Sequence, residues 1–220
     1  MRRIAIAAIA VLAILLMPGG VASAARTRHT EPRKCPPQHA HVIAADPYAL
    51  VYEAFDPPFG DLEVYGCAYG TRLSYLLGPP AEFSPSGGGG IDREAIGGTM
   101  VAYEESLLLG QLGIEPTRRQ LVIVRNLRTG RVVHKVPTGT STVPTPRYVG
   151  LGSAVAIVVK SDGSVAWIVE SGSEYQVHAV DKTGSRVLAS SSDIDPHSLA
   201  LAGVTLYWMQ GGKPASAVLN

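Results

Sequence analysis

The sequence predicts an all-β protein, on the evidence of its turn-forming residues, its short apolar runs and the spacing of its aromatic residues. The chain of 220 residues contains 24 Gly and 16 Pro, which is well above average usage. Most apolar runs are short and rich in Val, Ile, Tyr or Trp, which is typical of strands. A hydrophobic fraction of 46% with 17% charged residues excludes a disordered chain, and a formal net charge of +1 excludes a broadly basic surface for nucleic acid.

Residues 1–24 have the layout of a secretory signal peptide. A basic start at Arg2 and Arg3 is followed by 14 consecutive apolar residues, 4–17, and then by a helix-breaking Pro-Gly-Gly. The small residues 22–24 (Ala-Ser-Ala) precede the expected cleavage point. The alternative is a membrane anchor, but a bilayer span needs about 20 apolar residues. We therefore expect a secreted or extracytoplasmic protein with no stable membrane anchor after cleavage.

Residues 25–40 form a polar, Pro-containing leader that carries the first of two cysteines, Cys35 and Cys67. In an oxidising compartment, two cysteines with no third to compete predict one disulfide. That bond would tie the leader to the apparent strand around Cys67. The alternative is a pair of free thiols.

Residues 41–220 form the predicted β domain, in which short apolar runs alternate with turn signals. The predicted strands are Val42–Ala44, Ala49–Phe55, Leu62–Tyr69, Met100–Tyr103, Leu121–Arg125, Arg131–Val136, Ala154–Lys160, Val165–Glu170, Tyr175–Val180, Arg186–Ala189, Ser198–Ala202 and Thr205–Met209. One segment, Ser106–Leu112, is instead compatible with a helical turn.

The predicted strands resemble one another around four aromatic residues, Tyr52, Tyr103, Trp167 and Trp208, which are separated by 51, 64 and 41 residues. Because they recur at similar points of successive strands, we expect them in the core. After three of them comes a hairpin with a Gly turn, which can adopt a positive φ without steric cost. These turns are Gly70-Thr71, Thr129-Gly130 and Thr183-Gly184.

A unit of three or four strands that recurs every 40 to 60 residues predicts a propeller-like array of about four short antiparallel sheets. The last unit is incomplete, because only Lys213–Leu219 remains after Trp208 for another strand. A closed ring would need an N-terminal strand, such as His41–Ala44, to complete it. The alternative is a β-sandwich of two sheets.

The stretches Leu62–Cys67 and Ser198–Trp208, together with the Thr-Gly hairpins, resemble secreted actinobacterial proteins with TolB-type or WD-type propeller repeats. The resemblance covers about residues 45–219 and implies a fold of blade-like sheets. It implies no catalytic residues for this chain.

Signals for catalysis or metal binding are weak. No Gly-x-Ser-x-Gly nucleophile turn occurs, and the Gly87–Gly90 run lacks the Lys-Ser/Thr of a phosphate loop. Cys35, His39 and His41 could supply metal ligands only if Cys35 stays reduced. The pair Asp193 and Asp195 could offer oxygen ligands to Ca²⁺, but Asp before Pro more often starts a turn. We expect no metal and no cofactor, and no catalytic residue can be assigned.

The predicted links between units, residues 78–97, 137–150 and 190–197, should lie on one rim, where such scaffolds bind ligands. The candidate rim residues are Asp92, Arg93, Glu94, Arg147, Tyr148, Asp193, Asp195 and His197. Their mixed charge favours a non-enzymatic module that binds a protein or a polar ligand outside the cytoplasm. The alternatives are an extracytoplasmic hydrolase or lyase that uses the rim carboxylates, and a structural envelope protein.

Overall fold

The computed structural model describes Cys35, Pro37 and residues 40–55, 60–80, 90–109, 117–138 and 152–220, and within them every regular element is a β-strand. The first sheet contains β1 (His41–Ala45), β2 (Ala49–Phe55), β3 (Leu62–Ala68) and β4 (Ser74–Gly78). The second contains β5 (Ile91–Gly97), β6 (Met100–Leu109), β7 (Thr117–Asn126) and β8 (Val132–Pro137). The third contains β9 (Ala154–Val159), β10 (Val165–Ser171), β11 (Glu174–Asp181) and β12 (Gly184–Ser191). The fourth contains β13 (Ala200–Ala202), β14 (Thr205–Gln210) and β15 (Lys213–Val218).

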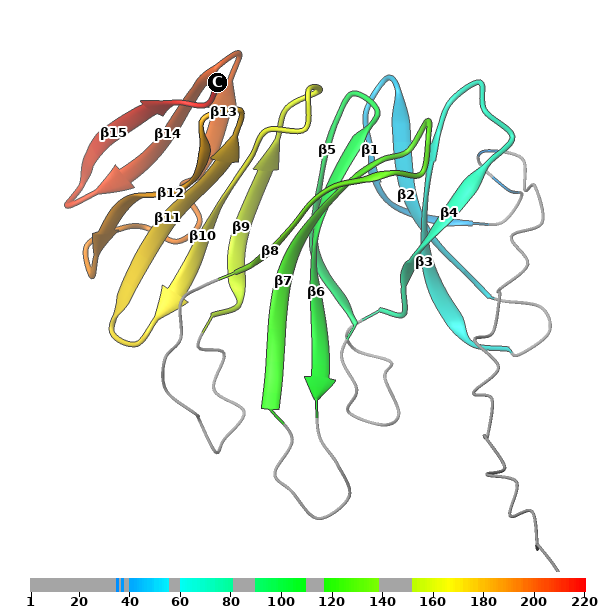
Figure 1. Ribbon diagram of the computed structural model, residues 1–220, viewed down its shortest axis with the longest axis horizontal. Helices are drawn as coiled ribbons and strands as arrows, with labels where there is room; N and C mark the ends of the chain where they lie inside the picture. Colours follow the sequence, from blue (N-terminus) through cyan, green and yellow to red (C-terminus); the bar gives the residue numbers. More distant parts are fainter. Residues whose placement is uncertain are drawn as a thin grey trace, which may run out of the picture.

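The four sheets are antiparallel, and the strands of each follow one another in chain order. Figure 1 shows the sheets side by side along the long axis, from the first at the right to the fourth at the left. The first strands of successive sheets are neighbours, β1 beside β5, β5 beside β9 and β9 beside β13. The first and fourth sheets lie at opposite ends, so the array is not closed. The predicted all-β, propeller-like array is confirmed, and the two-sheet sandwich is wrong.

The N-terminal strand belongs to the first sheet, so the expectation that it completes the last unit is wrong. Val42 of β1 pairs with Tyr52 of β2. The turn between these strands is held by Asp46, whose Oδ1 accepts hydrogen bonds from the amides of Tyr48 (2.7 Å) and Ala49 (2.8 Å). A local hairpin of this kind costs much less chain entropy than closure across the whole array.

The four aromatic residues singled out in the sequence lie on the second strand of each sheet, and all are core residues as predicted. Tyr52, Tyr103, Trp167 and Trp208 are at most 5% exposed. Tyr103 packs between the first and second sheets, Trp167 between the second and third, and Trp208 between the third and fourth. Each aromatic side chain therefore points toward the preceding layer.

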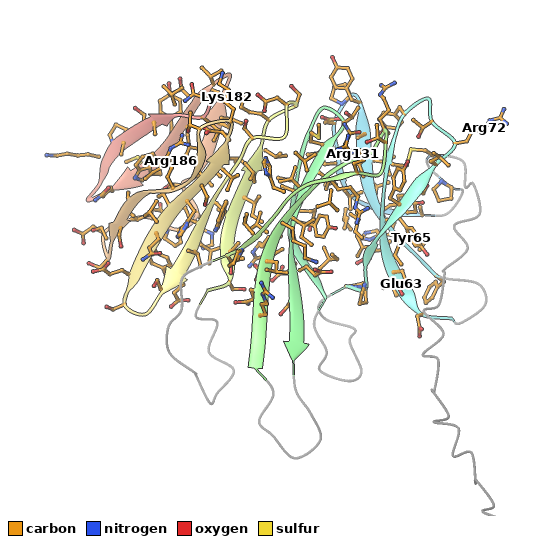
Figure 2. All side chains as sticks on the ribbon, in the orientation of Figure 1. Glu63, Tyr65, Arg72, Arg131, Lys182 and Arg186 are labelled. Atoms are coloured by element: carbon orange, nitrogen blue, oxygen red, sulfur yellow. A yellow bond between two sulfur atoms is a disulfide. The ribbon has the colours of Figure 1, made fainter. Side chains whose placement is uncertain are left out.

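Two described residues of the leader, Cys35 and Ala40, pack on the face of the first sheet that has no preceding sheet. Cys35 and Cys67 form the predicted disulfide, with a Cα–Cα distance of 5.9 Å. Cys35 packs against Tyr52 and Tyr65, whose rings stack with their centroids 5.6 Å apart. Figure 2 shows Tyr65 on the first sheet, at the right-hand end of the array. The disulfide thus holds Cys35 on this apolar face.

The Gly hairpins join the third and fourth strands of the first three sheets. Gly70, Gly130 and Gly184 have φ values of 75°, 75° and 106°, which a side chain rarely adopts. At Gly130 a Cβ atom would also overlap the ring of Tyr75 on the neighbouring sheet. Turn geometry and sheet packing therefore both require glycine at position 130.

Two sequence interpretations of the second sheet are wrong. Ser106–Leu109 is the end of β6 and pairs with Thr117–Gln120 of β7, not a helical turn; residues 110–112 lie outside the described residues. The run Ser-Leu-Leu-Leu is apolar without a clear period, so pairing with β7 decides its conformation. Residues 91–97, interpreted as part of a link, form β5, which is polar and irregular and therefore gave no strand signal.

No helix able to cross a membrane occurs in the part of the chain that the structure describes. The predicted signal peptide lies outside that part, as do residues 25–34 of the leader.

Candidate functional site

The most unusual backbone among the candidate residues is at Arg93, in a β-bulge of β5. Asp92 pairs with Glu104 and Glu94 pairs with Tyr103, so Arg93 has no partner on β6. Its φ is 52°, the one positive value at a non-glycine residue within the described ranges. Such a conformation costs of order 1–3 kcal/mol and often occurs at functional positions.

The bulge presents a mixed-charge group of side chains at the innermost strand of the second sheet. The amide of Arg93 donates to Asp92 Oδ1 (2.9 Å), and Arg93 Nη1 lies 3.4 Å from the same oxygen. Both side chains are about half exposed, at 52% for Arg93 and 48% for Asp92. Because both side chains are exposed, the pair is accessible to a ligand. An exposed ion pair of this kind contributes little to the free energy of unfolding.

Glu94 is a half-buried member of this group. Burial raises its pKa most strongly, and the charges of Asp92 and Glu53 raise it further, against the lowering effects of its own backbone amide and of Arg93. Within the described residues, no side chain donates a hydrogen bond to its carboxylate. A cation brought to this carboxylate would stabilise its ionised form.

Two neighbouring acids are already paired. Glu53 Oε2 lies 3.1 Å from His41 Nδ1, and Glu105 Oε2 lies 3.0 Å from Lys135 Nζ.

We call Glu53, Asp92, Arg93 and Glu94 the β5 cluster. Its three acids and one arginine give it an excess of negative charge that fits a basic group on a partner.

Nothing in the described part of the chain assembles three or more metal-ligating side chains. Cys35 is in a disulfide, so its sulfur cannot act as a thiolate ligand, and His39 lies outside the described residues. The β5 cluster is thus a set of hydrogen-bonding and charged groups.

Asp193, Asp195 and His197 lie in the link between β12 and β13, where their hydrogen bonds shape the turn. Asp195 Oδ1 accepts from the amide of His197 (3.0 Å), and the amide of Asp193 donates to Ser191 Oγ (3.1 Å). No hydrogen bond or ion pair of the described residues joins them to the β5 cluster. Arg147 and Tyr148 lie outside the described residues.

A buried acid that the sequence did not indicate, Glu104, joins the second sheet to the third. Its side chain is 1% exposed, and its carboxylate accepts from Ser153 Oγ (2.9 Å) and from the amide of Ala154 (2.8 Å). Ser153 Oγ also accepts from Gln120 Nε2 (2.9 Å). Glu104 is therefore fully engaged in joining the sheets. Its only sequence signal is an acid placed within an apolar strand.

Exposed basic residues lie in or next to the hairpin turns of the first three sheets. Figure 2 shows Arg72, Arg131 and Lys182 along the upper side, in or next to the turns that join the third and fourth strands of three sheets. They lie far apart along the array, so they do not form one patch.

No family model matches the chain, and no curated protein matches it. Among solved structures, it is similar to that of a puromycin-hydrolyzing peptidase from Mycobacterium tuberculosis, with 14% sequence identity and a TM-score of 0.39. The match covers 80% of this chain but spans only 30% of the length of the peptidase chain. We draw nothing about activity from a similarity of this level.

Proposed function

We propose that the protein is an extracytoplasmic, non-enzymatic interaction module that binds a basic protein loop at the β5 cluster. The signal-peptide layout of residues 1–24 supports export, and the Cys35–Cys67 disulfide is compatible with an oxidising compartment. A loop carrying Lys or Arg suits the cluster because its acids outnumber its cations.

The observation that carries this proposal is the left-handed conformation of Arg93 between two acids. A glycine would adopt this φ without strain, so the arginine side chain has a role that offsets its backbone cost. In the proposed complex, Arg93 orients the carboxylate of Asp92, while Glu94 receives a cation from the partner. Burial of that new ion pair supplies specificity more than affinity.

The test is a selection of displayed loop peptides on the disulfide-bonded protein. Peptides that bind the β5 cluster should contain Lys or Arg, and their affinity should fall at least about tenfold, or about 1.4 kcal/mol, for Glu94→Gln and for Asp92→Asn. Lys182→Glu, in an exposed hairpin turn on another sheet, is the matched control and should bind as the unaltered protein does. Selected peptides that bind both β5 variants with the same affinity as the unaltered protein would contradict the proposal.

A further inference from the structure

The link between the third and fourth sheets contains an Asp–Pro peptide bond, Asp195–Pro196, in a turn at the surface. The amide of Asp195 donates to Met209 O on β14 (2.9 Å), and the amide of Met209 donates to Ser198 Oγ (2.8 Å). Both ends of the turn are therefore fixed to the same residue of a regular strand. A turn held in this way keeps its polar groups in one arrangement, which favours a reaction between them.

The carbonyl group of this peptide bond accepts two hydrogen bonds from one residue. Ser198 Oγ lies 2.7 Å from Asp195 O, and the Ser198 amide nitrogen lies 3.2 Å from the same oxygen. Because Ser198 Oγ already accepts from the amide of Met209, its single hydrogen is directed at Asp195 O. Fixed donors of this kind stabilise the negative charge that develops on a carbonyl oxygen when a nucleophile adds to its carbon.

The nucleophile within reach is the side chain of Asp195 itself. Its Oδ1 accepts from the amide of His197 (3.0 Å), and the ring closed by this hydrogen bond contains both the carboxylate and the Asp195–Pro196 bond. The carboxylate is thereby held next to the bond. Attack by a carboxylate oxygen on the carbonyl carbon of its own residue closes a cyclic anhydride, and proximity strongly favours such intramolecular steps.

Pro196 decides which reaction the turn can undergo. Its nitrogen carries no hydrogen, so it cannot attack the Asp195 side chain to form a succinimide, the usual self-reaction of aspartate. The tertiary amide nitrogen of proline takes up a proton more readily than that of another peptide bond, which makes it the better leaving group. Asp195 and His197 are exposed, so water can supply the proton and can then open the anhydride.

We propose that Asp195–Pro196 is a self-cleavage site. A carboxylate oxygen of Asp195 forms a bond to the carbonyl carbon of the same residue, the C–N bond to Pro196 breaks, and the proline nitrogen leaves with a proton taken from solvent. A water molecule then hydrolyses the cyclic anhydride, which restores the Asp195 side chain and leaves a new α-carboxylate. Each chain reacts once, and the net change is the addition of one water molecule.

A second Asp–Pro bond, Asp46–Pro47, provides an internal comparison. Asp46 Oδ1 accepts from the amides of Tyr48 (2.7 Å) and Ala49 (2.8 Å), and Oδ2 accepts from the amide of Gly98 (2.8 Å). Both carboxylate oxygens would have to give up hydrogen bonds before either could attack. Within the described ranges, no hydroxyl group donates to the carbonyl oxygen of Asp46. We therefore expect this bond to stay intact while the bond in the link breaks.

Cleavage leaves the fourth sheet attached to the third without a covalent connection at the link. Leu206 and Trp208 still pack on the third sheet, and the amide of Asn220 still donates to Asp181 Oδ2 (2.8 Å). The cleaved protein should therefore elute as one species in size-exclusion chromatography and separate into two fragments only when it is unfolded.

Mass spectrometry of the full, disulfide-bonded protein, kept folded in mildly acidic buffer, tests the proposal. A fragment that begins at Pro196 should accumulate, and no fragment should begin at Pro47. Unfolding in guanidinium chloride at the same pH removes the turn, so cleavage before Pro196 should slow at least about tenfold and approach the rate before Pro47. No cleavage before Pro196, or cleavage no faster in the folded than in the unfolded protein, would overturn the proposal.

Single substitutions separate self-cleavage from cleavage by a contaminating protease. Asp195→Asn removes the carboxylate nucleophile and should abolish the fragment, and Ser198→Ala removes the hydroxyl donor and should slow cleavage at least about tenfold. Asp193→Asn alters an exposed acid of the same link and is the matched control, which should cleave as the unaltered protein does. Circular dichroism verifies that each variant is folded in the assay buffer. A fragment that still forms from Asp195→Asn at the original rate would overturn the proposal.

Discussion

The side chains of Asp181 and Arg186 form a two-armed ion pair at the turn between β11 and β12. Arg186 Nη1 donates to Asp181 Oδ1 (2.7 Å), and Nη2 donates to Oδ2 (2.8 Å). The same carboxylate accepts from the amide of Asn220 (2.8 Å), so the pair also fixes the end of the fourth sheet onto the third. Figure 2 shows Arg186 beside this end of the array.

Removal of Arg186 should destabilise the protein strongly. Asp181 is fully buried, with a side-chain exposure of 0%, so Arg186→Met leaves a buried carboxylate without its main partner. We expect a loss of about 3 kcal/mol in the free energy of unfolding, measured by urea denaturation at neutral pH. The double variant Asp181→Asn with Arg186→Met should lose less, because no charge is left buried. A double variant less stable than Arg186→Met would contradict this account of the pair.

The same pair predicts a loss of stability in acid. The Arg186 hydrogen bonds hold the pKa of Asp181 well below its usual value, despite the opposing effect of burial. A carboxyl whose folded pKa is depressed stabilises the fold above its unfolded pKa, near pH 4, and loses that contribution as the pH falls toward the folded pKa. Asp181→Asn should therefore show a smaller decrease in unfolding free energy below about pH 4 than the unaltered protein. If the unfolding free energies of Asp181→Asn and of the unaltered protein decreased in parallel below about pH 4, Asp181 would not contribute to the acid sensitivity.

His178 should cause a second, smaller decrease in the free energy of unfolding, at a higher pH than that of Asp181. It is 6% exposed and stacks on Trp167 with the ring centroids 5.2 Å apart, and burial lowers its pKa. When a histidine is kept neutral in the folded state, the free energy of unfolding decreases as the pH falls below the unfolded pKa of about 6.5. The reason is that the unfolded chain takes up a proton and the folded chain does not. Comparison of urea denaturation at pH 7 and 5 should give a smaller loss for His178→Phe, which keeps the stack. An equal loss in both proteins would refute this assignment.

Adjacent residues on β14 should respond differently to truncation. Trp208 is 5% exposed in the core between the third and fourth sheets, and Tyr207 is 41% exposed on the other face. Trp208→Ala should cost about 3 to 5 kcal/mol in unfolding free energy. Tyr207→Ala should change it by less than about 0.5 kcal/mol, because this side chain is exposed. Equal losses would mean that the two faces of the fourth sheet are not as described.

The disulfide should stabilise the first sheet in particular. It links cysteines 32 residues apart in sequence, and loss of such a loop closure costs about 3 to 4 kcal/mol. Cys35→Ser with Cys67→Ser should also speed amide hydrogen exchange in β2 and β3, where Cys35 packs against Tyr52 and Tyr65. Exchange in β14 is the internal control and should change little. Unchanged exchange in β2 would show that the leader does not depend on the disulfide.

The fold class could be predicted from the sequence because the buried second strands are apolar and the turns between third and fourth strands need glycine. The sequence also predicted the disulfide and the burial of the four aromatic residues Tyr52, Tyr103, Trp167 and Trp208. It did not reveal β5, whose residues Asp92–Glu94 interrupt the strand with a bulge. Glu104 was missed because its role depends on Ser153 and Ala154 of another sheet, a contact between residues about 50 apart in the chain.

The proposed function places a partner on the β5 cluster, and site-specific photo-crosslinking in the organism that makes the protein tests this most directly. A photoreactive residue at position 41, where the exposed side chain lies beside Glu53 and all four cluster residues are kept, should give a discrete adduct, while the same residue at position 182 should give none. A selected basic peptide should remove the adduct at position 41. No adduct at position 41, or equal adducts at positions 41 and 182, would contradict the account.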